Sequence, residues 1–201
     1  MSDLFSWILL VPLYALGAFP TGKLVSRMHG VDITAHGSGN VGATNVARVI
    51  GKRAGLVTLL GDVLKGAVGV LVASLLAPRG AFPAAAAAAV VCGHCFSLPP
   101  FLKGGKGVAT ALGAVIALHV WSGVVAIAAF AAVFALTGIV SLSSLIAALI
   151  VPVSSLLMNL PEAATVSYAV IAGVVILRHR DNIHRLVEGR EAKFRFRQEA
   201  E

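Results

Sequence analysis

Long apolar segments, separated by short polar and basic breaks, dominate the chain. A helix needs about 20 residues to cross the roughly 30 Å hydrocarbon core of a bilayer, so segments of this kind indicate membrane-spanning helices. Hydrophobic residues make up 58% of the 201 residues and charged residues only 12%, and this leaves too few charges to cover a soluble domain. The composition therefore excludes a soluble globule, a disordered chain and a disulfide-rich secreted scaffold.

Seven apolar segments are candidate transmembrane helices, and they are too long and too uniformly apolar for the strands of a barrel. They are Leu4–Val25, Gly55–Ala77, Phe82–Leu98, Gly107–Leu118, Trp121–Val140, Ser141–Met158 and Ala163–Leu177. The fourth is short, and we expect the stretch Pro20-Thr21-Gly22-Lys23 to kink or end the first. The sequence predicts an all-α membrane protein with seven transmembrane helices in one integral-membrane domain, residues 1–201.

The positions of the basic residues predict the orientation of these helices. Thirteen of the 16 Lys and Arg residues lie in Ser26–Ala54, Pro99–Lys106 and the tail 178–201, which seven helices place on one side. The opposite side carries only Arg79, and two lysines fall inside predicted helices. Basic residues favour the cytoplasmic side of a membrane. We therefore expect the N-terminus outside and the C-terminal basic tail in the cytoplasm.

The net charge of +7 does not indicate a nucleic-acid partner. The basic residues form no stripe with interleaved aromatic side chains, and they occupy the breaks where membrane topology requires them. We predict membrane lipids around the protein and no nucleic acid among its partners.

The first cytoplasmic loop contains the sequence GSGNVGATNVAR over residues 37–48. Gly37, Gly39 and Gly42 match the spacing of a dinucleotide-binding fingerprint, but no buried strand precedes them and no βαβ unit surrounds them. Glycines still expose backbone N–H groups to an anion, and Arg48 adds a planar fork suited to phosphate. The loop predicts an anion site; its alternative is an ordinary turn-rich loop.

The second loop places Lys106 among Gly104, Gly105 and Gly107 at the start of a predicted helix. It is not a Walker A loop, because Gly107 occupies the position of Ser or Thr. A lysine among glycines at a helix N-terminus nevertheless predicts a phosphate cradle. Lys103 fits better as a basic anchor at the membrane surface.

Two polar groups inside apolar segments admit more than one interpretation. Cys92 and Cys95 flank His94, but thiols on the cytoplasmic side stay reduced, and no further metal ligands lie nearby in sequence. We therefore expect neither redox nor metal chemistry there. Asp62 and Lys65 lie at i, i+3 on one helix face, where a structural ion pair and a contribution to the site are equally open, because buried ionisable groups pair or face a cavity.

Polar residues also follow the fifth and the seventh predicted helices on the cytoplasmic side. Ser141 and Ser144 begin the sixth helix, and RHRDNIHRL follows the seventh from residue 178. Basic side chains at such a helix end can contact anionic lipid. That explanation does not cover His179 and Asn182, which lie on one turn and are candidate site residues.

Five motifs in this order resemble a known family: SGNxGATN, DxxKG, GHxF with KGGKGVAT, VSLxS and RHRxNIxRL. They are similar to those of the bacterial membrane acyltransferases that move a fatty acyl group from acyl phosphate to glycerol 3-phosphate, and the resemblance covers about residues 17–191. It implies a seven-span protein of the bacterial inner membrane with a cytoplasmic active site. The implied product is 1-acyl-glycerol 3-phosphate, an early intermediate of phospholipid biosynthesis.

The resemblance implies which side chains contact the substrate phosphates: Ser38, Asn45, Arg48, Lys106, Ser144, His179 and Asn182. Combined with the loop motifs, it leads us to expect catalytic roles for His179, Lys106 and Ser38. The full set of expected substrate contacts is Ser38, Gly39, Asn40, Gly42, Thr44, Asn45, Arg48, Gly104, Gly105, Lys106, Gly107, Ser141, Ser144, His179 and Asn182. No metal or cofactor is expected. One departure is Gly138-Ile139, where the family often has Arg-Tyr.

No side chain stands out as a nucleophile, so we expect direct transfer of the acyl group between the two substrates. Either His179 or the substrate phosphate could accept the proton of the attacking hydroxyl. The His-x₄-Asp dyad of acyl-CoA-dependent enzymes is absent. The alternative function is a transporter or channel for an organic phosphate, but the chain is poor in deep polar groups and has no visible inverted repeat.

Overall fold

The computed structural model describes residues 7–77, 81–97 and 104–194, and every regular element in these ranges is helical. This agrees with the predicted all-α class. The elements are α2 (Leu10–Ala18), α3 (Thr21–Met28), a 3₁₀ turn (Ile33–Ala35), α4 (Ala43–Val49), α5 (Lys52–Leu76), α6 (Phe82–Cys95), α7 (Val108–Leu118), α8 (Val120–Thr137), α9 (Val140–Leu157), α10 (Glu162–Arg178) and α11 (Arg180–Val187).

Three of the described helices, α5, α8 and α9, are long and apolar enough to cross a bilayer. The pair α10 and α11 makes a fourth if it is counted together, although it is bent by 64°. The apolar helices α6 and α7 are shorter, and the 11 residues of α7 rise only about 16 Å at 1.5 Å per residue. Each of the seven predicted apolar segments thus contains a helix. That all seven cross the membrane completely remains a prediction. Leu4, Leu98 and Arg79 lie outside the described residues.

The first predicted span is divided, as its Pro20-Thr21-Gly22-Lys23 stretch suggested. Helix α2 ends at Ala18 and α3 begins at Thr21, and the cyclic side chain of Pro20 between them cannot continue the helical hydrogen bonding. The carbonyl of Phe19 at this break accepts a hydrogen bond from Lys65 Nζ on α5 at 3.0 Å. A deep lysine therefore satisfies part of the backbone that the break leaves unbonded.

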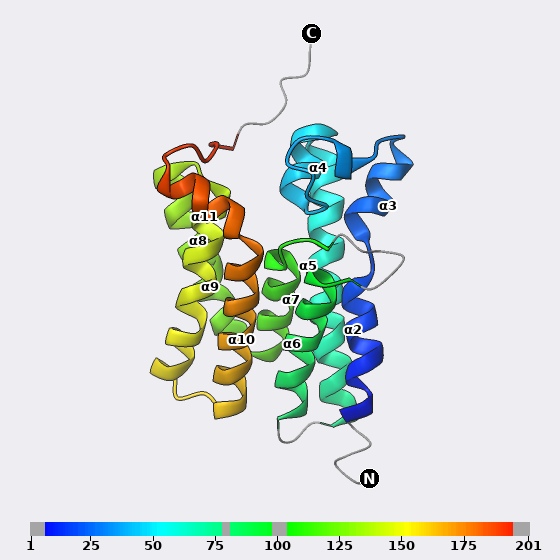
Figure 1. The fold of residues 1–201 in the computed structure, drawn as a ribbon. Helices are drawn as coiled ribbons and strands as arrows, with labels where there is room; N and C mark the ends of the chain where they lie inside the picture. Colours follow the sequence, from blue (N-terminus) through cyan, green and yellow to red (C-terminus); the bar gives the residue numbers. More distant parts are fainter. Residues whose placement is uncertain (1–6, 78–80, 98–103, 195–201) are drawn as a thin grey trace.

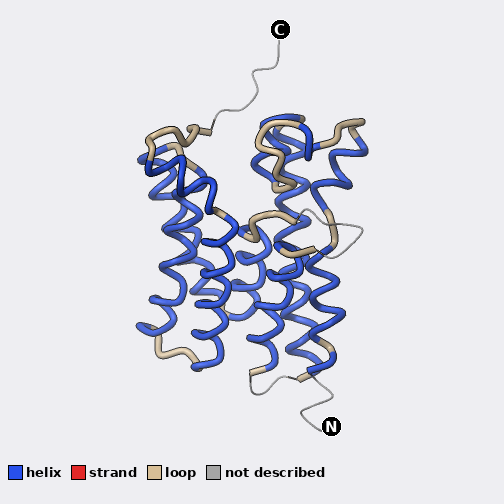
Figure 2. The backbone as a smooth tube through the Cα atoms, viewed as in Figure 1, coloured by secondary structure: helices blue, strands red, loops and turns tan. Residues whose placement is uncertain are grey.

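The helices form a bundle in which α2, α5, α6 and α7 lie together beside α8, α9 and α10 (Figure 1). Helices α3, α4 and α11 lie at one end of this bundle, and α2 begins at the opposite end (Figure 1). Figure 2 shows the long loop before α4 and the segment after α11 at that same end. The first glycine-rich loop and the polar segment after α10 therefore lie at the same end of the bundle. This agrees with the prediction that both lie on one side of the membrane.

Close contacts between backbones hold α5, α6 and α7 to their neighbours. A Cβ atom on Gly113 of α7 would lie 1.9 Å from the carbonyl oxygen of Val63, and one on Gly66 of α5 would lie 2.0 Å from that of Thr110. Gly93 of α6 approaches the carbonyl of Tyr14 in the same way. Small residues that let backbones touch are the usual means of packing helices in lipid, where water supplies little driving force.

We predict that Gly113→Ala destabilises the protein, because the added methyl must push α7 away from α5. Overpacking of this kind costs about 1–3 kcal/mol, and the midpoint of thermal unfolding in detergent should fall. Gly173→Ala on α10 is the matched control, because nothing lies within 4 Å of its added Cβ. An equal midpoint in the two variants would contradict this account of the α5–α7 contact.

Candidate active site

Lys106 lies at the centre of a polar network that joins four parts of the chain. Its Nζ donates to Asn182 Oδ1 on α11 at 2.6 Å, and Asn182 Nδ2 donates to Glu191 Oε1 at 2.5 Å. Glu191 also accepts from Ser141 Oγ on α9 at 2.7 Å and from Arg185 Nε at 2.6 Å. The network brings together three predicted site residues, Lys106, Ser141 and Asn182, that are far apart in sequence.

Burial and neighbouring charges determine the protonation of this network. Burial lowers the pKa of Lys106 to about 8, Glu191 opposes that shift, and Arg48 adds to it. Burial alone would raise the pKa of Glu191, but hydrogen bonds from Ser141, Asn182 and Arg185 outweigh it and lower the pKa.

His179 occupies the junction between α10 and α11 and is almost fully buried. Its Nδ1 lies 2.8 Å from the carbonyl oxygen of Val175. A carbonyl can only accept, so Nδ1 carries the proton and the neutral ring keeps Nε2 as an acceptor. His179 and Asn182 are three residues apart around the start of α11, as expected of two groups on one turn.

The second glycine loop approaches the end of α6 closely. The N–H of Gly105 donates to the carbonyl of His94 at 3.1 Å, and a Cβ on Gly105 would lie 2.1 Å from His94 Nε2. Gly107 has φ +83° as the N-cap of α7, and no side chain caps that helix. The first amides of α7 therefore lack side-chain partners beside Lys106, which suits an anion.

Asn45 shapes the first glycine-rich loop. Its Oδ1 accepts from the N–H of Ser38 at 2.9 Å, and its Nδ2 donates to the carbonyls of His36 at 3.0 Å and Asn40 at 2.9 Å. The Asn40 side chain in turn accepts from the N–H of Gly42 at 2.8 Å. The amide groups of both asparagines thus hold the loop in shape.

Other side chains of this loop remain available. Within the described residues, no hydrogen bond engages the hydroxyls of Ser38 and Thr44 or the half-buried guanidinium of Arg48. By contrast, the Ser144 hydroxyl on α9 donates to the carbonyl of Val140 at 2.8 Å, within its own helix. The groups free to meet an anion from the first loop are therefore Ser38, Thr44 and Arg48.

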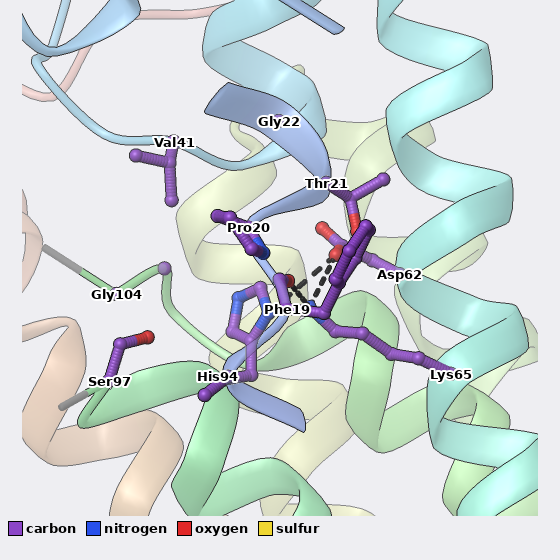
Figure 3. Close-up of a pocket in the computed structure, with 12 residues that line it drawn as sticks. Phe19, Pro20, Thr21, Gly22, Val41, Asp62, Lys65, His94, Ser97 and Gly104 are labelled. Carbon is purple, nitrogen blue, oxygen red and sulfur yellow. Dashed lines mark hydrogen bonds and ion pairs between the residues drawn. The ribbon is translucent and has the colours of Figure 1, made fainter. Parts of the chain in front are cut away.

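Asp62, Lys65 and His94 help to line a small cavity at the α2–α3 break (Figure 3). Asp62 Oδ1 lies 2.8 Å from Lys65 Nζ and 3.7 Å from His94 Nδ1. Val41 and Gly104 also line the cavity, so it lies against both glycine loops. Asp62 and Lys65 thus pair with each other and also line this cavity, as buried ionisable groups are expected to do.

Two residues of this region were not expected from the sequence. Glu191 connects Asn182, Ser141 and Arg185, and Arg178 contacts the second glycine loop. No motif or periodicity singles out Glu191 in a tail rich in charge. In the sequence, Arg178 is one of several basic residues of that tail, and only the fold brings it to residues 104–105. Lys103, Arg195 and Arg197 lie outside the described residues.

Metal ligation and disulfide bonding find no support in the described part of the chain. Residues 7–77, 81–97 and 104–194 contain no group of three or more His, Cys, Asp and Glu side chains suited to hold a metal ion. Cys92 and Cys95 are both free thiols in α6.

Together these features describe a membrane protein whose described residues fold into helices, with a candidate anion-binding site at one end of the bundle. A model of the glycerol-3-phosphate acyltransferase family matches residues 7–189. The glycerol-3-phosphate acyltransferase of Geobacter sulfurreducens is 45% identical over 188 residues, covering 94% of this chain and 97% of that protein. The enzyme of Trichlorobacter lovleyi is 41% identical over 182 residues, covering 90% and 94%.

Solved structures give the same result. The chain is similar to PlsY, an integral membrane glycerol 3-phosphate acyltransferase, in its glycerol 3-phosphate form, with a TM-score of 0.90, 34% identity and coverage of 94% of this chain and 96% of that one. The lysophosphatidic acid form of PlsY matches with a TM-score of 0.88. The chain belongs to the glycerol-3-phosphate acyltransferase family.

We predict that Asn45→Ala loosens the first loop, because it leaves the His36 and Asn40 carbonyls and the Ser38 N–H without their partner. Amide hydrogen exchange over residues 36–45 should accelerate by about fivefold or more, if roughly 1 kcal/mol of hydrogen bonding is lost. Thr44→Ala is the control, since that hydroxyl makes no such bond. Unchanged exchange in Asn45→Ala would show that the loop keeps its shape by other contacts.

Proposed function

We propose that this protein transfers a fatty acyl group to glycerol 3-phosphate and releases 1-acyl-glycerol 3-phosphate. Membership of the family and the similarity to PlsY in its glycerol 3-phosphate and lysophosphatidic acid forms support the activity. The observation that carries the proposal to this chain is the Lys106–Asn182–Glu191 network at the uncapped start of α7, with Arg48 of α4 at the same end of the bundle (Figure 1). It offers two cations and unpartnered amides to phosphate groups.

The acyl donor in this proposal is acyl phosphate. A mixed anhydride already has a good leaving group, so the protein needs mainly to hold two anions together and direct the hydroxyl toward the carbonyl. Arg48, Ser38 and Thr44 would receive one phosphate from α4 and its loop. Lys106 and the first turn of α7 would receive the other, and would meet the charge that develops on the carbonyl oxygen.

The hydroxyl of glycerol 3-phosphate attacks the acyl carbonyl directly, and the phosphate of the donor leaves. His179 Nε2 is the protein group suited to accept the hydroxyl proton, because Nδ1 is committed to Val175. The substrate phosphate, with a second pKa near 6, is the alternative acceptor. Ser141 and Asn182 position this end through Glu191 and Lys106 rather than through the reacting atoms.

The site belongs on the cytoplasmic side of the bacterial inner membrane in this proposal. The end of the bundle that carries α3, α4 and α11 holds most of the Lys and Arg residues, as the positive-inside rule requires of a cytoplasmic face. Seven crossings, with the N-terminus outside, fit the positions of α2 and α11 at opposite ends. Transport gains no support, because Asp62 and Lys65 bond each other and Lys65 also bonds the backbone at the α2–α3 break.

The purified protein in detergent, supplied with glycerol 3-phosphate and either acyl phosphate or acyl-CoA, tests the proposal directly. We expect lysolipid from acyl phosphate and none from acyl-CoA, measured by chromatography of the labelled product. Product from acyl-CoA alone would overturn the assigned donor. Absence of product from both would overturn the proposed activity.

We predict that Lys106→Ala and Arg48→Ala each lower kcat/KM for glycerol 3-phosphate by about tenfold or more, equivalent to ~1.4 kcal/mol of lost transition-state contact. Initial rates over a range of glycerol 3-phosphate concentrations measure the effect. Arg180→Ala is the control, because that exposed side chain pairs only with Asp181. Wild-type rates in both variants would contradict the assignment of two phosphate-binding cations.

We also predict that kcat/KM falls as the pH rises above about 8. The pKa of Lys106 is lowered to about 8, so its ammonium is charged below that pH and neutral above it. Because kcat/KM reports the free enzyme, loss of this charge should weaken capture of the phosphate. In Lys106→Ala the residual kcat/KM should show no such fall, and a persistent fall would assign it to another group.

A further inference from the structure

Arg178, the last residue of α10, contacts the loop that precedes Lys106. Its Nε donates to the carbonyl of Gly105 at 3.0 Å, and its Nη2 donates to the carbonyl of Gly104 at 2.9 Å. The guanidinium carbon lies 5.9 Å from the ring centroid of Phe96, which follows α6. The planar fork of arginine suits two neighbouring acceptors and an aromatic face at once.

The Gly104–Gly105 peptide group, whose carbonyl accepts from Arg178, also bonds α6 through its N–H. The N–H of Gly105 donates to the carbonyl of His94 at 3.1 Å. A Cβ on Gly104 would lie 2.4 Å from the carbonyl oxygens of both His94 and Cys95, so the loop cannot move closer to α6. Residues 104 and 105 are thus fixed between α6 and the Arg178 side chain. These contacts therefore also fix the main chain of Lys106, which is the next residue.

Arg178 also directly precedes His179 in the chain. One residue therefore connects, through its main chain, to His179 and, through its side chain, to the segment that carries Lys106. We propose that Arg178 is a positioning residue that sets the placement of Lys106 relative to His179 for the substrate phosphate. This inference rests on the proposed function, because it assigns Arg178 a part in that same site.

A lysine at position 178 separates this role from a role of charge alone. Lysine keeps the positive charge, but its single ammonium has no planar fork for two carbonyls and no flat face for Phe96. If charge were sufficient, Arg178→Lys would behave as the wild type. If the two carbonyl hydrogen bonds position Lys106, Arg178→Lys would lose activity much as a Lys106 variant does.

The test is a double-mutant cycle on purified protein, in which kcat and KM for glycerol 3-phosphate are measured for wild type, Arg178→Lys, Lys106→Ala and the double variant. We expect Arg178→Lys to lower kcat/KM by about tenfold in the wild-type background. In the Lys106→Ala background the same change should lower it by less than about twofold, because the residue it positions is gone. Arg180→Lys, at an exposed position of the next turn, is the matched control and should stay within twofold of wild type.

Two results would overturn the positioning role. One is wild-type kcat/KM in Arg178→Lys, and the other is an equal fold-loss in both backgrounds. Size-exclusion elution and thermal unfolding check that each variant folds. If Arg178→Lys departs from the wild type in these measurements while Lys106→Ala does not, Arg178 is needed for folding and the proposal also fails. Lack of product from the wild type refutes the proposed function instead, and calorimetric binding of glycerol 3-phosphate to the same variants still tests Arg178.

Discussion

The placement of a half-buried ammonium organises this end of the molecule. Lys106 has left much of its water, and burial alone disfavours its charge. The amide of Asn182, held in turn by the carboxylate of Glu191, compensates part of that cost. Because Glu191 also binds Ser141 and Arg185, it links the start of α9, α11 and the segment after α11 to one cation near the start of α7.

The two glycine-rich loops at this end of the molecule are held in shape by different groups. In the second loop, Gly104 and Gly105 let the main chain press against α6, so their peptide groups bond His94 and Arg178. In the first loop, the side chains of Asn40 and Asn45 shape the backbone, and Arg48 takes no part in those hydrogen bonds. A glycine-rich segment near an anion site therefore need not offer all of its amides to the anion.

Much of the fold could be predicted from the sequence, because a 20-residue apolar segment has few alternatives in a bilayer. The helices α5 to α10 begin and end within a few residues of the predicted bounds. Helix α4 could not be predicted, because its seven residues, with only Val46 and Val49 as large apolar side chains, are too few to show a helical periodicity. The motifs indicated Lys106, His179 and Asn182. Glu191 and Arg178, by contrast, bond partners up to 50 and 74 positions away, and only the fold brings such partners together.

The turn between α8 and α9 links the departure at Gly138-Ile139 to the end of the described chain. The N–H of Phe194 donates to the carbonyl of Gly138 at 2.8 Å, and the Lys193 side chain lies 3.8 Å from where a Cβ on Gly138 would be. A side chain at position 138 would therefore begin in van der Waals contact with Lys193, on a backbone whose φ of +70° favours glycine. The turn and the C-terminal segment are therefore in direct contact, so the residue at position 138 bears on the packing of the chain's C-terminal end.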